Sequence, residues 1–221
     1  MMPDMKRTAI ALLLILALLC SAVAGLPMGY SAVSTDAENI ALDFTQNVLP
    51  VDMLQYTAVL TKYTQRRAQE DVTLALGSNQ SDVEVIYIIE NDVITGIIFN
   101  VKRGSVIADR PYDDFGAYVK GFLEKYQIFT GIDSPEMVNM LADVDLTQNS
   151  ASKTGNTTLV ISNRDLAGSL GHHTSLVWSY VVNGCKYPGL SIGFDDFVFS
   201  GLNDKRSIYE IGDTAVNVSQ E

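Results

Sequence analysis

The sequence predicts an α+β fold in which amphipathic helices pack on antiparallel β-meanders. Two stretches of the chain repeat apolar residues at helical spacing. Each is followed by runs that alternate with the two-residue period of a half-buried strand. Some of these runs are joined by turns as short as Asn91-Asp92 and Asn183-Gly184, and such short connections allow only antiparallel pairing. The hydrophobic fraction of 47% is sufficient for a buried core.

The first predicted helix begins in a capping box. Thr35 and Glu38 stand three residues apart, so each side chain can bond the backbone N–H of the other residue. Pro50 ends the helix, because the residue before a proline avoids the helical region. The expected apolar face consists of Ala37, Ile40, Ala41, Phe44 and Val48.

A first meander of four strands is predicted after this helix. The third run, VEVIYII, alternates clearly and turns at Asn91-Asp92 into the fourth. The four expected strands cover residues 56–64, 72–76, 83–89 and 93–101.

A second helical region is predicted over residues 111–130, where six aromatic or aliphatic residues fall at helical spacing and Gly131 ends the pattern. Ser134-Pro135-Glu136 then opens a short helix with proline in its first turn. Residues 147–155 are polar and are expected to form a connection without a strand.

A second meander is predicted next, with Asn183-Gly184 as its clearest hairpin turn. The pattern of helix followed by meander therefore occurs twice, in element order and not in residue identity. Two architectures remain open: two cystatin-like or PepSY-like units over residues 35–110 and 111–221, or one larger sheet covered by both helices. The expected strands cover residues 158–162, 174–182, 190–194, 197–200 and 207–211.

The first 24 residues have the order of a secretory signal peptide. Lys6 and Arg7 precede an apolar run from Ala9 to Leu19, and the small residues around Ala24 predict cleavage after that residue. Residues 25–34 would form a flexible lead. We therefore expect a secreted or extracytoplasmic protein. Cleavage is favoured because the apolar run is shorter than the roughly 20 apolar residues that a membrane span needs. An uncleaved N-terminal anchor is the main alternative.

The charge excludes two classes of partner. The chain carries −11, and removal of the signal segment, whose net charge is +1, leaves −12. Such a surface repels nucleic acid and anionic lipids, so we expect membrane contact only through an uncleaved signal. Three glycosylation sequons, at Asn79, Asn156 and Asn217, predict an exported glycoprotein.

One motif invites a catalytic interpretation. Residues 189–193 match G-x-S-x-G, the nucleophile elbow of α/β-hydrolases, where a strand turns into a helix at the serine. Here Ser191 is followed by a predicted strand and by no histidine, so we expect it to be an outward strand residue. The two histidines, His172 and His173, are expected in an exposed turn where they could titrate near neutrality.

The acidic pairs predict turns and helix starts and not calcium sites, since none has the spacing of a calcium-binding loop. Asp113-Asp114 is expected at the start of a helix, and Asp195-Asp196 in a hairpin turn. Asp143 and Asp145 match no clear motif. Cys185, the one cysteine outside the leader, is expected to be a half-buried strand residue, and Trp178 a core residue. No catalytic, cofactor-binding or metal-binding residue is assigned.

Two passages, KGFLEKYQIFTG over residues 120–131 and IYEIGDTAVNVSQE over residues 208–221, resemble a loose group of exported archaeal proteins. The resemblance covers most of the chain after the signal but includes no catalytic motif. It implies an archaeal exported protein with an α+β ectodomain. The group has no established activity, so the resemblance implies no substrate or cofactor.

Export, an acidic surface and the sequons favour a non-enzymatic interaction module of the cell envelope or extracellular space, whose partner is a protein, peptide or glycan. Two alternatives remain open: a secreted hydrolase with a carboxylate-based site, and a cystatin-like or PepSY-like protease inhibitor or regulator. An enzyme would bring Asp, Glu or His side chains together in a concave pocket, whereas a binding module would leave them scattered.

Overall fold

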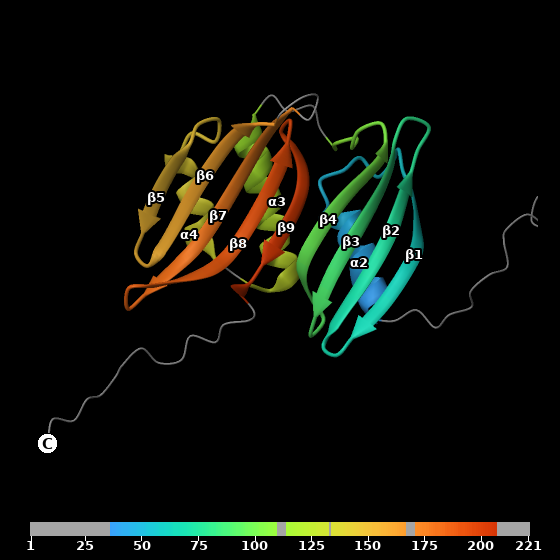
Figure 1. Cartoon of the computed structure of the whole chain (residues 1–221), viewed down its shortest axis with the longest axis horizontal. Helices are drawn as coiled ribbons and strands as arrows, with labels where there is room; N and C mark the ends of the chain where they lie inside the picture. Colours follow the sequence, from blue (N-terminus) through green and yellow to red (C-terminus); the bar gives the residue numbers. More distant parts are fainter. Residues whose placement is uncertain (1–35, 110–113, 133, 167–170, 207–221) are drawn as a thin grey trace, which may run out of the picture. The chain divides into compact units, whose positions relative to one another are not determined.

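The nine strands in the described part of the chain form one antiparallel sheet. The structure is a computed structural model that describes residues 36–109, 114–132, 134–166 and 171–206. In these ranges the strand order is β1-β2-β3-β4-β9-β8-β7-β6-β5, and every pairing is antiparallel (Figure 1). The predicted α+β class is therefore confirmed, with one continuous sheet and three helices in the described ranges.

The first half of the sheet follows one helix. Four of the five residues on the predicted apolar face of that helix are buried, and Ile40 is half-buried. The predicted strands are all present and are longer by one to three residues at most ends, because the polar ends of a strand carry no apolar period that would reveal them. The elements are α2 (Asp36–Asn47), β1 (Thr57–Arg66), β2 (Gln69–Gly77), β3 (Asp82–Glu90) and β4 (Val93–Arg103).

The second half follows two helices and a short 3-10 turn over Met140–Asp143. The polar stretch 147–155, which we expected to be a connection, contains an additional strand, whose exposed sequence SASKT has no apolar face to detect. The strand expected over 207–211 lies outside the described residues. The elements are α3 (Phe115–Thr130), α4 (Pro135–Asn139), β5 (Ser150–Thr154), β6 (Thr157–Asp165), β7 (His172–Val182), β8 (Cys185–Asp195) and β9 (Val198–Asp204).

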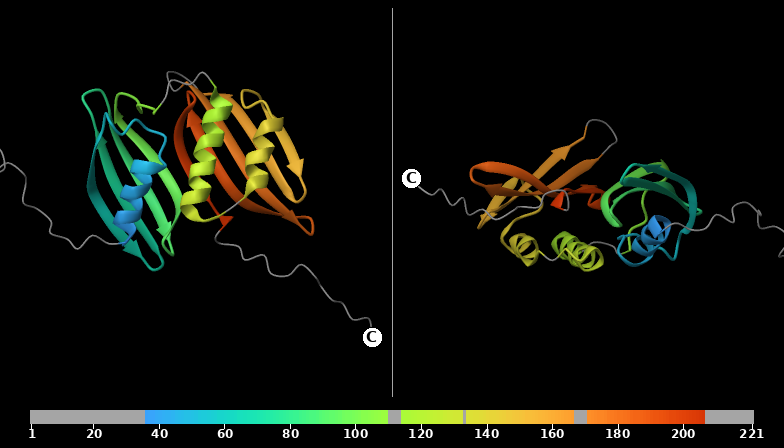
Figure 2. Two further views of the ribbon diagram at one scale, coloured as in Figure 1. Left: turned by 180° about the vertical axis from the view of Figure 1, so that it is seen from behind. Right: turned by 90° about the horizontal axis from the view of Figure 1, so that it is seen from below.

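All three helices cover the same face of the sheet (Figure 2). Phe44 of α2 contacts Phe129 of α3 edge-to-face, with ring centroids 5.1 Å apart, and lies 5.9 Å from Tyr87 of β3. One hydrophobic cluster therefore extends across both halves. Its largest fully buried side chains are Trp178, Tyr87, Tyr126, Phe44, Phe194 and Phe199.

The two halves meet at their last strands. β4 and β9 pair over only three positions, with Ile97 opposite Leu202 at the centre. Gly201 is required at this junction, because a Cβ there would lie 2.9 Å from the carbonyl oxygen of Ile97.

The last hairpin of each half has the same register. Adding 105 to a residue number in β3–β4 gives its counterpart in β8–β9. Glu90↔Val93 becomes Asp195↔Val198, and Ile88↔Gly96 becomes Gly193↔Gly201. Both hairpins shift register by one residue at the same place, and both turn through two left-handed non-glycine residues. The turn residues are Asn91, Asp92, Asp196 and Phe197.

Candidate functional site

The two histidines of the chain lie at the start of β7, each against an aspartate. His172 Nδ1 is 3.0 Å from Asp165 Oδ1 on β6, and His173 Nδ1 is 2.5 Å from Asp195 Oδ1 on β8. The expectation of an exposed turn is wrong, since both are strand residues whose side chains are 28% and 20% exposed. Because neighbouring strand residues point to opposite faces, the two imidazoles lie on different faces of the sheet.

His172 connects the start of β7 to the β8–β9 turn. Its Nε2 lies 3.0 Å from Asn163 Oδ1, which also accepts a hydrogen bond from Thr174 Oγ1 at 2.7 Å. Its backbone N–H donates to Asp196 Oδ1 at 2.8 Å. The ring of Phe197 lies 5.8 Å from the imidazole. These contacts fix the turn against the neighbouring strands.

His173 lies on the face away from the helices, beside Gly193. A Cβ at Gly193 would be 3.4 Å from His173 Cε1 and 3.1 Å from Ser200 Oγ. Aspartate, imidazole and hydroxyl therefore stand in the order of a nucleophilic triad. However, the hydrogen bonds of the described chain include none between His173 and Ser200. The β8 backbone also pairs with β7 and β9, so its N–H groups are already used and cannot stabilise an oxyanion.

The described residues contain no group of three or more His, Cys, Asp or Glu side chains that could hold a metal ion. The carboxylates of Asp165 and Asp195 each bind one imidazole instead. This arrangement fixes the orientation of the two rings.

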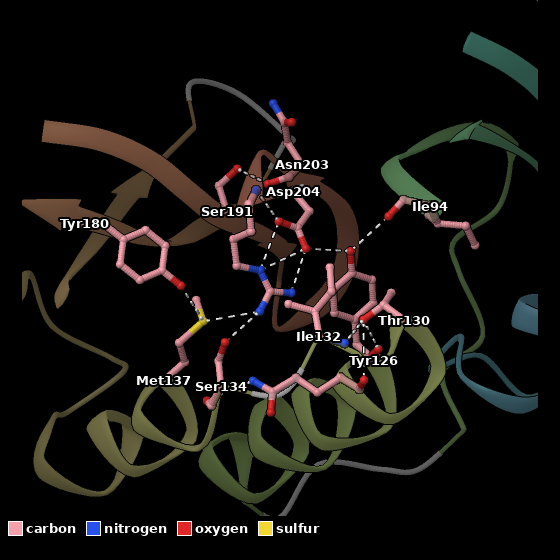
Figure 3. A network of polar contacts seen from close by, with 12 residues as sticks. Ile94, Tyr126, Thr130, Ile132, Ser134, Met137, Tyr180, Ser191, Asn203 and Asp204 are labelled. Carbon is pink, nitrogen blue, oxygen red and sulfur yellow. Dashed lines mark hydrogen bonds and ion pairs between the residues drawn. The ribbon is translucent and has the colours of Figure 1, made fainter. Parts of the chain in front are cut away.

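A buried ion pair lies at the end of β9 (Figure 3). Arg206 Nη2 lies 2.6 Å from Asp204 Oδ2, with the two side chains 4% and 2% exposed. Burial disfavours the charge of Arg206, but the hydrogen bonds and the charge of Asp204 outweigh it and raise the pKa of the guanidinium. Tyr126 of α3 donates to Asp204 Oδ2 at 2.9 Å. Burial, followed by the charge of Asp204, raises the pKa of this phenol well above its usual value.

The same arginine fastens the α3–α4 connection to the sheet. Its Nη1 donates to Ser134 Oγ at 3.2 Å and lies 3.6 Å from Met137 Sδ. The guanidinium nitrogens are therefore engaged within the protein, which indicates a structural role for the network.

An open groove of about 610 Å³ lies between α3 and α4. Its apolar lining includes Ile128, Pro135 and Val138, and Ile128 is 83% exposed. Lys120 Nζ and Glu124 Oε1 lie 3.9 Å apart in the same lining. The groove thus combines aliphatic surface with one exposed ion pair.

β1 forms one of the two edges of the sheet, and three basic residues lie in it and in the turn that follows it. None of Lys62, Arg66 and Arg67 has an ion-pair partner in the part of the chain that the structure describes. Val59 and Leu60 of the same strand are 53% and 37% exposed. In a chain of net charge −11, this edge is locally cationic and partly apolar.

The G-x-S-x-G serine is an outward strand residue, as predicted. Ser191 lies within β8, between the buried Leu190 and Ile192, and its Oγ donates to the carbonyl oxygen of Asn203 at 3.4 Å. A strand continues on both sides of it, so the strand-to-helix turn of a nucleophile elbow does not form.

The acidic pairs take the predicted positions where they are described. Asp114 caps α3 by accepting from the Ala117 N–H at 3.1 Å, and Asp113 lies outside the described residues. Asp196 lies in the β8–β9 turn. Asp145 accepts from the Thr147 hydroxyl and N–H, and these hydrogen bonds lower the pKa of its carboxyl.

Two sequon asparagines, Asn79 and Asn156, are exposed in the β2–β3 and β5–β6 connections. Asn217 and the expected cleavage site after Ala24 lie outside the described residues. Cys185 is exposed and not half-buried as expected, because it directly follows the Asn183-Gly184 turn. The sequence offered no local signal for the histidine–aspartate contacts, which join residues on different strands.

Comparisons of the chain with known protein families, with curated proteins and with solved structures found no match. Among the described helices, none is both long enough and apolar enough to cross a bilayer.

Proposed function

We propose that this chain is an exported, non-enzymatic module that binds an extended acidic segment of a cell-envelope or extracellular protein along β1. The observation that carries the proposal is the cationic edge formed by Lys62, Arg66 and Arg67 in an acidic protein. The signal-like N-terminal segment supports the proposed export. The order of helix followed by meander supports the further proposal that each half resembles a cystatin-like or PepSY-like module.

Strand addition would supply the affinity. β1 is ten residues long and pairs only with β2, so the backbone groups on its other side form no ladder in the described sheet. An extended peptide would bond to these groups, and its side chains would contact Val59 and Leu60. The register shift between Leu60 and Lys62 divides the edge, so the segment before the shift is the simplest place for pairing to begin.

The charges would supply the selectivity. Lysine on an edge strand discourages pairing with another copy of the same edge, since like charges directly opposite repel. The same charges favour an acidic partner and raise its rate of association. Because exposed charges are screened over about 8 Å at physiological ionic strength, binding should weaken as salt is added.

The experiment measures binding of two labelled eight-residue peptides to the full chain by fluorescence anisotropy. One peptide alternates valine with glutamate, and the other alternates valine with lysine. We expect only the acidic peptide to bind. A Lys62→Glu, Arg66→Glu and Arg67→Glu triple variant should weaken it by tenfold or more, about 1.4 kcal/mol. An N-methylated acidic peptide should bind weakly, because its backbone cannot complete a ladder.

The matched control reverses three cations elsewhere: Lys125, Lys153 and Lys186, which are exposed and have the same total charge change. This variant should retain the affinity of the native chain. Equal loss in both triple variants, or equal binding of the two peptides, would contradict the proposal.

A secreted hydrolase is the second candidate, favoured by the order of Asp195, His173 and Ser200 around Gly193. Hydrolysis of an activated ester by the native chain that is lost in Ser200→Ala would support this candidate. We expect no such activity, since the backbone donors nearby are occupied.

A further inference from the structure

The two sequons within the described residues differ in how the fold places their third residue. N-glycosylation requires an asparagine together with a serine or threonine two positions later, whose hydroxyl belongs to the motif that the transferase recognises. Asn79 and Asn156 are both exposed, so the asparagines alone do not distinguish the two sites. The corresponding third residues are Ser81 and Thr158.

The first sequon is closed by the fold. Ser81 is fully buried, and its Oγ accepts a hydrogen bond from the Tyr56 hydroxyl at 3.1 Å. The backbone around it forms a tight turn, in which the Ser78 N–H donates to the Ser81 carbonyl oxygen at 2.8 Å. Arg103 Nη1 donates to the carbonyl oxygen of Asn79 at 3.1 Å and holds the turn against β4. A transferase therefore reaches the Ser81 hydroxyl only when this turn opens.

The second sequon is open. Asn156 lies in the β5–β6 turn, and Thr158 is the second residue of β6. Thr157 is buried and donates to Glu136 Oε2 at 3.0 Å. Because successive strand residues alternate, Thr158 lies on the other face of the sheet. It is half-buried, and its hydroxyl forms no hydrogen bond within the described part of the chain. Both groups of this sequon are accessible in the folded protein.

We propose that Asn156 is an N-glycosylation site of the folded chain and that the fold closes Asn79. The co-substrate is an oligosaccharide bonded through its anomeric carbon to a lipid-linked phosphate. The amide nitrogen of Asn156 forms a bond to that carbon as the carbon–oxygen bond to the phosphate breaks. The electrons of the broken bond leave with the phosphate, and one amide proton passes to a base of the transferase. In the cell this step rests on the export that is part of the proposed function.

The position of Asn156 gives the glycan a structural consequence. β5 is the edge strand opposite β1 (Figure 1), and its last residue, Thr154, stands two positions before Asn156. A bulky, hydrated glycan at this turn would obstruct strand pairing along β5. The turn that contains Asn79 adjoins the start of β1, where Thr57 pairs with Gly77. An unmodified Asn79 therefore leaves β1 open to a partner.

The test compares glycosylation of the folded full chain with glycosylation of its tryptic peptides. Each is incubated with a purified oligosaccharyltransferase and a lipid-linked oligosaccharide, and mass spectrometry follows the modified fraction at each asparagine. Trypsin leaves both sequons intact, in the peptides 68–102 and 154–164. The peptide rates correct for any preference of the enzyme between serine and threonine at the third position.

The measured quantity is the rate in the folded chain divided by the rate in the peptide. This ratio should be at least about tenfold higher at Asn156 than at Asn79, because Asn79 reacts only when its turn opens locally. Equal ratios at the two sites, or a higher ratio at Asn79, would overturn the proposal. Since purified components are used, the result depends neither on export nor on β1. Failure of the proposed export would be seen separately, as cytosolic protein that retains residues 1–24.

Discussion

The two halves of the sheet use one backbone arrangement with different side-chain chemistry. Their last hairpins share register, register shift and left-handed turns. At equivalent positions the first hairpin has Phe99 where the second has Asp204, whose carboxylate pairs with Arg206. The second half also carries both histidines of the chain, with His173 opposite Asp195 where the first half pairs Gln69 with Glu90.

This comparison indicates that the turn geometry and the register shift determine the backbone pairing of the two hairpins. The side chains on the strands differ without changing that pairing. Left-handed turn residues match the twist of a two-residue hairpin whether they are Asn91-Asp92 or Asp196-Phe197. The first half carries basic residues along its edge strand β1. The second half carries the two histidine–aspartate contacts and the Asp204–Arg206 ion pair at the end of β9.

The largest expected effect comes from the buried ion pair, which among the described residues occurs in the second half alone. Arg206→Ala would leave Asp204 buried with its charge uncompensated, so the free energy of unfolding should fall by about 3–5 kcal/mol. Urea denaturation measures this loss. Combining Arg206→Met with Asp204→Leu should recover most of it, because an apolar pair leaves no buried charge.

The matched control is the exposed pair of the first half, Arg103 and Asp82, whose side chains are about half exposed. Arg103→Ala should cost far less than Arg206→Ala. Similar losses in the two variants would show that burial does not distinguish the pairs.

The next effect concerns the equivalent glycines Gly96 and Gly201. A Cβ at Gly201 meets the Ile97 carbonyl oxygen at 2.9 Å, whereas one at Gly96 meets the Ile88 side chain. A side chain can move and a paired backbone cannot. Gly201→Ala should therefore lower the free energy of unfolding by about 1–3 kcal/mol, and Gly96→Ala by less. Thermal and urea unfolding of both variants measure the two losses. A larger loss in Gly96→Ala than in Gly201→Ala would contradict the close contact at the β4–β9 junction.

Alkaline pH should affect both halves equally. Burial raises the pKa of Tyr87 and Tyr126, one in each half. Unfolded phenols ionise near pH 10. Above that pH the unfolded state binds fewer protons than the folded state, so stability falls as pH rises. At pH 11 each phenol should cost about 1 kcal/mol relative to pH 9.

The corresponding variants are Tyr87→Phe and Tyr126→Phe. In each variant the loss of stability between pH 9 and pH 11 should be smaller by about 1 kcal/mol than in the native chain. The two variants should agree because only the unfolded phenol ionises in this range, as long as the pKa of the folded phenol lies above it. Unchanged pH dependence in either variant would show that its phenol is accessible in the folded protein.

The smallest effect is expected at the two turns. Asp92→Gly should stabilise the protein by up to about 1 kcal/mol, because glycine adopts a positive φ without the clash of a Cβ. Phe197→Gly should show no such gain, since the Phe197 ring contacts Phe115 at a centroid distance of 5.0 Å. A larger gain for Phe197→Gly would show that this ring contact contributes little.

Much of the secondary structure could be predicted from local pattern, and the contacts between elements could not. Alternation located β3 through Val83, Val85, Tyr87 and Ile89 because one face of that strand is buried. β5 has no buried face and left no such signal.

The candidate sites depend on contacts between residues that are far apart in the sequence. His173 contacts Asp195 because β7 and β8 pair, and the position of β9 beside β4 follows from packing across the whole sheet. The cationic residues of β1 are visible in the sequence, but its place at the edge of the sheet is not.

The most direct test of the central claim is the pattern of cross-strand NOEs in an NMR spectrum of the full chain. The claim is that two register-matched meanders join through their last strands and leave β1 at an edge. It predicts backbone NOEs from Ile97 to Leu202, from Glu90 to Val93 and from Asp195 to Val198, and NOEs from β1 to β2 alone. NOEs that pair β1 with β5, or that place β4 beside any strand except β3 and β9, would contradict it.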